Sequence, residues 1–308
     1  MNRNNMAYHR PVLLNESIEG LDIKPKGVYI DLTFGGGGHA RRILEQLGRK
    51  GRLLAFDQDP DAKGNLPDDK RLIFIHANFR YLKNFLRYHG IEAVDGVFAD
   101  LGISSHQIDE PDRGFSFRAD AMLDMRMNPA SGNSAERVLN EYDESDLRMV
   151  LKQYGELKNA GRIANRIAEA RSEKRIKTTV QLADIIQDLA PRDRQAKFFA
   201  KVYQAVRIEV NDEITSLKEM LGQTPDCISE GGRLVVITYH SIEDRLVKNF
   251  MKSGNVEGKM EKDFYGNLIT PWRLINRSVI VPGENEIHEN RRARSAKLRV
   301  SERVAENE

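Results

Sequence analysis

The sequence predicts an α/β protein in which a Rossmann-like parallel sheet carries an inserted helical domain. Two observations indicate the sheet. Up to about residue 100, short apolar runs bounded by turn residues alternate with helical patterns, and four successive glycines follow the first strand-like run. A third observation indicates the insertion: from Ser134 to about Leu221 the chain reads as long charged helices with apolar residues at helical spacing.

The elements expected before the insertion follow from these patterns in chain order. A helix over 11–21 precedes a strand over 28–32, and a helix over 40–47 ends where Gly48 interrupts the pattern. Strands over 53–56, 72–75 and 94–99 come next, with a helix over 80–88, ended by Gly90, between the last two. This order is typical of βαβ units with parallel strands.

Strand character resumes after the insertion. A turn pair, Gly231 and Gly232, precedes a strand over 233–238, a helix over 242–251 follows, and runs over 278–281 and 297–300 could close the sheet. Because a parallel crossover tolerates a large excursion, we place the insertion between strands four and five, with the chain returning through a helix over 198–221. The expected domains are 1–108 with 206–308, which form the sheet domain, and 109–205, the helical insertion.

Composition excludes several classes of protein. A chain of 308 residues that is 40% hydrophobic can bury a real core in one or two domains. Its first residues lack a secretory apolar segment, and no run approaches the roughly 18 apolar residues that span a bilayer, so we expect a cytoplasmic protein without membrane contact. The single cysteine, Cys227, excludes internal disulfides and a CxxC zinc site, and the seven histidines lack ligand-like spacing, so no metal is expected.

The glycine turn predicts a site for a nucleoside-containing cofactor. The run Gly35 to Gly38 lets the backbone approach a bound molecule closely, and Asp57, at the end of the second strand, can accept hydrogen bonds from ribose hydroxyls. The pattern alone also fits NAD. Two further acids at strand ends, Asp31 and Asp100, favour S-adenosylmethionine, while the alternative is a turn that merely reverses the chain tightly.

The loop after the fourth strand is a second candidate. Ligands of open α/β sheets collect beyond the carboxyl ends of the strands, so Asp100 and the loop up to Gln107 should share one crevice with the glycine turn. Alternatively, Asp100 caps the following turn and the loop polar groups are ordinary. Phe79, just beyond the third strand, could pack on an adenine or belong to the core, and His39 could touch a cofactor or simply begin its helix.

The segment from His240 to Arg245 contains a His, a Ser and two acids. A hydrolase triad is the tempting interpretation, but the Gly-x-Ser-x-Gly elbow is missing. Capping of the next helix by Ser241, with Asp244 at the third helical position, is the better prediction.

Affinity for nucleic acid must come from local patches, because the formal net charge is only +2. Two basic clusters can neutralise phosphates, although a solvated, salt-bridged helix face explains them equally well. Phe115 and Phe117 are candidates for stacking on a flipped base, or for the core. The clusters comprise Lys158, Arg162, Arg166, Arg171, Lys174, Arg175 and Lys177, and Arg291, Arg292, Arg294, Lys297 and Arg299.

Several uncommon motifs occur in a set order along nearly the whole chain. They are the segments 9–14, 33–39 (Thr-Phe-Gly-Gly-Gly-Gly-His), 100–105, 113–117 (Arg-Gly-Phe-Ser-Phe), 123–127 (Leu-Asp-Met-Arg-Met), 204–208, 240–245 and 292–295. In this order they resemble the bacterial 16S rRNA cytosine-N4 methyltransferases. The family often has a non-glycine residue where this chain has Gly36, which should loosen the turn slightly.

The resemblance implies a class I methyltransferase sheet with an inserted substrate-recognition domain. It also implies an S-adenosylmethionine-dependent enzyme that methylates the exocyclic amine of a decoding-site cytidine in 16S rRNA of the small ribosomal subunit. The family's cofactor contacts map onto Gly37, Gly38, His39, Asp57, Phe79, Asp100 and Gln107. The catalytic residue is unknown, and Asp100 is our hypothesis for the group that accepts a hydrogen bond from the amine. The oligomeric state, a homodimer included, is left open.

Two other functions remain in play on sequence grounds. An NAD-dependent oxidoreductase is allowed by the glycines and Asp57, but no second nucleotide-binding half is evident. A non-enzymatic RNA-binding assembly factor is allowed by the basic helices, but it leaves the three acids at strand ends unexplained.

Overall fold

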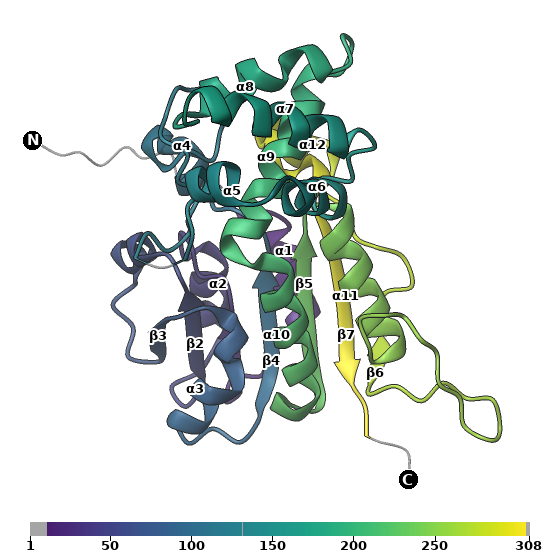
Figure 1. Ribbon diagram of the computed structural model, residues 1–308. Helices are drawn as coiled ribbons and strands as arrows, with labels where there is room; N and C mark the ends of the chain where they lie inside the picture. Colours follow the sequence, from purple (N-terminus) through teal and green to yellow (C-terminus); the bar gives the residue numbers. More distant parts are fainter. Residues whose placement is uncertain (1–10, 131, 306–308) are drawn as a thin grey trace, which may run out of the picture. The chain divides into compact units, whose positions relative to one another are not determined.

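The computed structural model describes residues 11–130 and 132–305 (Figure 1). The chain forms two compact units. The first, here called the sheet unit, comprises the chain up to Gly102 and from Thr215 onward, and the second, the helical unit, comprises Ile103–Ile214. Residues 9 and 10 of the first sequence motif lie outside the described residues.

The sheet unit is built on seven strands in the order β3-β2-β1-β4-β5-β7-β6. The first five are parallel, and β7 and β6 are antiparallel to their neighbours. Because β2 and β4 pair with opposite edges of β1, the strand order reverses there, and this is where open α/β sheets bind ligands. The strands are β1 Val28–Asp31, β2 Arg52–Asp57, β3 Leu72–His76, β4 Val94–Asp100, β5 Ile228–Thr238, β6 Trp272–Leu274 and β7 Lys297–Arg303.

The central strands are apolar on both faces because helices cover both. Side chains alternate across a strand, so Ile30 and Val97 enter the core on one face while Tyr29 and Phe98 enter the core on the other. The helices α3 Leu82–Tyr88, α10 Glu213–Cys227 and α11 Ser241–Ser253 cover the first face, in front of the sheet in Figure 1. The helices α1 Leu14–Leu21 and α2 Gly38–Gln46 cover the second. The predicted α/β Rossmann-like fold is confirmed.

Shorter elements complete the sheet unit. They are the 3-10 helices η1 Pro60–Asn65, η2 Phe79–Tyr81 and η5 Arg291–Ser295, and the helix α12 Glu284–Glu289. Within the described residues, no helix has the length and apolar character needed to cross a membrane.

The helical unit has its own core, which includes Val138, Leu147, Ile163 and Val202. Phe115 belongs to this core, and Phe117 packs against it with its ring 5.5 Å from those of Phe199 and Tyr203. Both phenylalanines therefore have core positions, which supports the second of the two alternatives and not stacking on a base. The elements are α4 Ser105–Asp109, η3 Pro111–Arg113, α5 Ala135–Glu141, α6 Glu144–Gln153, α7 Ala160–Glu173, α8 Thr179–Ile186, η4 Gln187–Leu189 and α9 Gln195–Asn211.

Three local predictions were wrong. The helix expected over 198–221 is two helices, because Asp212 adopts a left-handed conformation with φ +48° that ends α9. The run over 278–281 makes only an isolated bridge between Ile280 and Leu298, and β6 takes the place beside β7 instead. Gly231 and Gly232 lie within β5, where its register against β4 shifts, rather than before it.

The cap of α11 also differs from the prediction. His240, not Ser241, is the N-cap, and Glu243, not Asp244, is the residue that completes the capping box. His240 fills this place because its Nδ1 accepts a hydrogen bond from the backbone N–H of Glu243 at 3.4 Å.

Candidate active site

The glycine turn links the carboxyl end of β1 to α2. Gly35 and Gly37 have φ values of +50° and +74°, a region that favours glycine. A Cβ at Gly37 would lie 2.8 Å from the ring of Phe34, and a Cβ at Gly38 would lie 2.1 Å from Cγ of Pro11. A Cβ at Gly36, in contrast, would have no heavy atom within 4 Å. Local packing therefore accounts for glycine at 37 and 38, whereas the turn is open at 36.

Hydrogen bonds hold this turn from three sides. The backbone N–H of Gly35 donates to Oδ2 of Asp57 at 2.7 Å. The Asn65 side chain donates to the carbonyl of Gly35 at 3.0 Å, and Arg41 donates to the carbonyl of Gly36 at 2.8 Å. The turn is thus preorganised, so that little backbone freedom is lost when a ligand binds against it.

Three carboxyl groups end three adjacent strands beside the turn. Asp31 ends β1, Asp57 ends β2 and Asp100 ends β4. The pKa of Asp31 is raised to about 7, mainly by burial; the backbone hydrogen bond from Thr33 opposes this rise, and the charges of Asp100 and Asp57 add to it, so the three groups interact electrostatically. Burial likewise raises the pKa of Asp57 to about 6 and that of Asp100 to about 7.

Asp31 is the most enclosed of the three, with 1% of its surface exposed. Its Oδ1 accepts a hydrogen bond from the backbone N–H of Thr33 at 3.0 Å, while its buried Oδ2 has no partner among the described residues. A buried carboxylate oxygen without a partner is costly. A cationic or strongly donating group of a ligand would satisfy it.

Asp57 organises the turn and has capacity left for a ligand. Its two oxygens accept backbone hydrogen bonds from Gly35 and, at 2.8 Å, from Asp59. Each carboxylate oxygen can accept a second bond, so two ribose hydroxyls can still be bound. The same two backbone hydrogen bonds work against burial and lower the pKa of Asp57.

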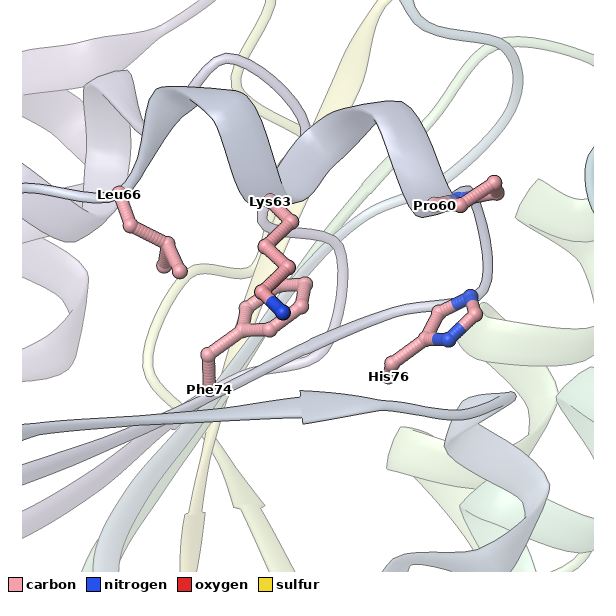
Figure 2. A pocket seen from close by; sticks show the side chains of 5 residues that line it. All are labelled: Pro60, Lys63, Leu66, Phe74 and His76. Carbon is pink, nitrogen blue, oxygen red and sulfur yellow. The ribbon is translucent and has the colours of Figure 1, made fainter.

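A cavity of about 500 Å³ lies between η1 and β3, and His76 is among the residues that line it. Figure 2 shows Pro60 and Lys63 on η1, with Leu66 just after it, facing Phe74 and His76 on β3. The three carboxyl groups do not line it. It is therefore a neighbour of the carboxylate cluster and not the cluster's own cleft.

Asp100 is positioned by two groups that the sequence analysis did not identify. Its backbone N–H donates to Oγ1 of Thr33 at 2.7 Å, and its Oδ1 accepts a hydrogen bond from the hydroxyl of Tyr239 at 2.8 Å. The backbone N–H of Tyr239 in turn donates to Oε2 of buried Glu243 at 3.0 Å. The signal that could have found Tyr239 is its place directly after β5, at the same sheet edge.

Three of the predicted site residues, His39, Phe79 and Gln107, are not part of the carboxylate cluster. His39 is buried, its Nε2 lies 3.1 Å from the carbonyl of Val12, and burial lowers its pKa to about 4, so it is neutral and held by the protein itself. Phe79 begins η2 beyond β3 and packs, half-buried, against the core of the sheet unit. Gln107 belongs to the helical unit, where its Oε1 accepts from the backbone N–H of Ser104 at 3.1 Å and caps α4.

The sheet unit therefore brings together Gly37, Gly38, Asp57 and Asp100, and with them Asp31, the remaining strand-end acid named in the sequence analysis. A glycine turn and converging acids at the switch point of a parallel sheet define a Rossmann-like protein that binds a nucleoside-containing cofactor.

Comparison with known proteins narrows this class. The MraW methylase family matches residues 6–304. A relative from Bacteroides thetaiotaomicron is 55% identical over 303 residues, which are 98% of this chain and 100% of the relative. One from Flavobacterium johnsoniae is 54% identical over 299 residues, covering 97% and 99%. Both are named "Ribosomal RNA small subunit methyltransferase H".

Among solved structures, a putative rRNA-methylase from Clostridium thermocellum is 12% identical, with a TM-score of 0.46 over 96% of this chain and 98% of that one. The identity to the curated relatives, in contrast, is high and covers the full length. The chain belongs to the MraW methylase family. The prediction of a methyltransferase with S-adenosylmethionine as its cofactor is thereby confirmed, and the oxidoreductase and the non-enzymatic alternatives fall away.

Proposed function

We propose that this enzyme methylates the exocyclic N4 amine of a decoding-site cytidine in 16S rRNA of the small ribosomal subunit. The observation that carries the proposal is full-length identity of about 55% to relatives named as small-subunit rRNA methyltransferases. The carboxylate cluster beside the glycine turn supplies a cofactor site that suits this reaction. We further propose a cytoplasmic location, because the ribosomal substrate is found there.

The residues at the turn fit S-adenosylmethionine. The unpaired, buried Oδ2 of Asp31 suits its ammonium group, and the remaining acceptor capacity of Asp57 suits its ribose hydroxyls. The open backbone at Gly36 leaves room for close approach, and Phe79 would contact the adenine. Gly37 and Gly38 keep the turn in shape, His39 supports it from within, and we keep Gln107 as a proposed contact from the helical unit.

The bound cofactor supplies an electrophilic methyl group. The protein's task is to hold the cytidine amine in line with that group, because orientation is the main catalytic resource in a direct displacement. The cofactor held at the turn would supply the methyl carbon for a new nitrogen–carbon bond at the expense of its sulfur–carbon bond, and the amine would give up one proton. Asp100, whose pKa of about 7 lies near neutrality, can accept a hydrogen bond from the amine and then its proton.

The position of Cys227 argues against methylation at carbon 5 of cytosine, which normally needs a cysteine nucleophile. Cys227 ends α10 directly before β5, at the amino end of that strand, whereas the carboxylates lie at the carboxyl ends. Burial also raises the pKa of its thiol to about 11, so the thiolate is scarce. Transfer to N4 needs no such nucleophile.

We propose the helical insertion, expected over 109–205, as the substrate-recognition domain. Part of its basic cluster is occupied within the unit: Arg166 pairs with Asp188 at 3.0 Å, and Arg175 pairs with Glu136 at 2.8 Å. The exposed Lys158 and Arg162 are better placed to meet phosphates. Homodimer formation is compatible with this proposal and is tested by the mass of the protein in solution.

The deciding experiment is transfer of labelled methyl groups to small ribosomal subunits that lack the modification, with mass spectrometry to locate the product. We expect one N4-methylated cytidine at the decoding site. Naked 16S rRNA, assayed in parallel, identifies the form of the substrate. Label on carbon 5, or on no ribosomal nucleotide at all, would refute the proposed function.

A further inference from the structure

A second cavity, of about 250 Å³, lies at the far side of the sheet unit from the glycine turn. Its lining residues come from α11, β6, β7 and the segment after β6. Figure 1 shows α11, β6 and β7 at the yellow-green end of the sheet. In the strand order, β7 is separated from β4 by β5, so this cavity is distinct from the carboxylate cluster. We call it the edge pocket; its lining is Lys248, Lys252, Leu274, Asn276, Arg277, Ser278, Arg299 and Val300.

The edge pocket has an excess of positive charge. No acid is among the described residues that line it, and Asp244, which pairs with the lining residue Arg299 at 2.8 Å, also pairs with Lys297 at 3.0 Å. Asp244 lies one helical turn before Lys248 on α11, and Lys252 follows one turn later. A single carboxylate thus faces a row of cations that it cannot neutralise.

Three of the cations have no ion-pair partner in the described part of the chain: Lys248, Lys252 and Arg277. All three side chains are exposed, so their charges are available to a ligand. Long side chains around one hollow can be drawn together by a polyanion, whereas without one they repel each other.

The rest of the lining suits a nucleotide better than a bare anion. Leu274 provides an apolar surface, and Ser278 provides a hydroxyl. Oδ1 of Asn276 is enclosed without a hydrogen-bond partner among the described residues. A chain of phosphodiesters with ribose hydroxyls matches this combination of cations, small polar groups and apolar surface.

We propose that the edge pocket binds the phosphodiester backbone of the RNA substrate, away from the nucleotide that is methylated. This rests on the proposed function, since it assumes an RNA substrate. The pocket contributes affinity and position rather than sequence selection, because phosphates carry no sequence information. Its cations are scattered over positions 248, 252 and 277, and only Arg299 belongs to a basic cluster seen in the sequence.

The test is a triple variant, Lys248→Ala, Lys252→Ala and Arg277→Ala, in the full-length chain. Its affinity for a 16S rRNA fragment and for small subunits is measured across a salt series. The matched control removes the same charge at the amino edge of the sheet, with Lys26→Ala, Arg49→Ala and Lys50→Ala, all exposed and all outside the proposed machinery. Thermal unfolding and S-adenosylmethionine affinity show that each variant is folded.

We expect the triple variant to bind RNA roughly 25- to 100-fold more weakly near physiological salt, and the slope of log affinity against log salt to fall by about 2, as for two or three lost phosphate contacts. The control should bind like the unsubstituted protein. A second variant, Lys248→Arg with Lys252→Arg, should retain the affinity because it retains the charge.

The outcomes separate this proposal from the proposed function. An RNA affinity and salt slope in the triple variant equal to those of the control would overturn the edge pocket as an RNA site, while methyl transfer by the unsubstituted protein would leave the function intact. Absence of methyl transfer by the unsubstituted protein would instead overturn the function, and with it the assumption of an RNA substrate on which the edge pocket depends.

Discussion

The hydroxyl of Tyr239 donates a 2.8 Å hydrogen bond to Oδ1 of Asp100 and so joins the carboxyl ends of β5 and β4. Burial raises the pKa of Asp100 to about 7, and this bond limits the rise because it favours the charged form. Burial and the adjacent carboxylate in turn raise the pKa of Tyr239 well above its usual range, so the tyrosine remains a donor. The pair therefore sets the pH at which Asp100 becomes an acceptor.

Replacing Tyr239 with phenylalanine should move the pH dependence of methyl transfer toward alkaline pH. Loss of one hydrogen bond to the carboxylate, about 1 kcal/mol, corresponds to a rise of roughly 0.5 to 1 in the pKa of Asp100. The measurement is the single-turnover rate from pH 5.5 to 9. Asp100→Asn should remove the ascending limb and slow turnover, and full turnover with undiminished cofactor affinity in that variant would exclude Asp100 as the acceptor.

Asp31→Asn should stabilise the protein without cofactor and weaken cofactor binding. At pH 8 the native carboxylate is charged, almost fully buried and only half-satisfied, so its removal should raise the free energy of unfolding by about 1 to 3 kcal/mol. The amide can still accept from Thr33. Urea unfolding and calorimetric titration with S-adenosylmethionine measure the two effects. Exposed Asp68→Asn is the matched control and should change neither; a destabilised Asp31 variant would contradict the argument.

The stability of the cofactor-free protein should decrease as the pH rises from about 6.5 to 8. The folded pKa values of Asp31 and Asp100, about 7, lie above the unfolded value of 3.8, so the native state binds more protons in this window and stability is lost as they leave. His39 acts in the opposite direction below about pH 6.5. Burial lowers its folded pKa to about 4, so the unfolded state binds its proton more readily and this contribution to stability is lost as the pH falls. Urea midpoints at successive pH values test this, and Asp31→Asn with Asp100→Asn should flatten the alkaline slope.

Asp57→Ala should weaken S-adenosylmethionine binding by roughly 1.5 to 3 kcal/mol if the side chain accepts two ribose hydroxyls at a buried site. The substitution also removes the acceptor for the backbone N–H of Gly35, so part of the loss comes from a looser turn. Calorimetry measures the affinity, with NADH as the ligand that should not bind. An unchanged affinity would remove Asp57 from the cofactor site.

The parallel half of the sheet was predictable because its signals are local. Strand, turn and acid occur within a short stretch from Val28 to Asp57, and the apolar runs of β1 to β4 are bounded by clear turn residues. The antiparallel end of the sheet had weaker sequence signals. The strand β6 has only three residues, Trp272–Leu274, and its pairing with β7 is set by tertiary contact rather than by any period in the sequence.

The candidate site was predictable where an acid directly ends a strand, as with Asp57 and Asp100. Tyr239 and the edge-pocket cations were not, because their partners lie far away in sequence: Tyr239 meets Asp100 across 139 positions. His39 shows that a position in the sequence does not reveal which group a side chain contacts. Its place beside the glycines suggests a cofactor contact, but only the structure shows its Nε2 beside the carbonyl of Val12.

The glycine turn offers a matched pair of substitutions that tests the packing of Gly38 against Pro11. Gly38→Ala would place Cβ 2.1 Å from Cγ of Pro11, so the segment before α1 must shift, and we expect a loss of about 1 to 3 kcal/mol in unfolding free energy. Gly36→Ala meets no heavy atom within 4 Å and should leave that free energy unchanged to within about 0.5 kcal/mol. Urea unfolding without cofactor compares the two variants, and equal stability losses would show that Pro11 does not limit the turn.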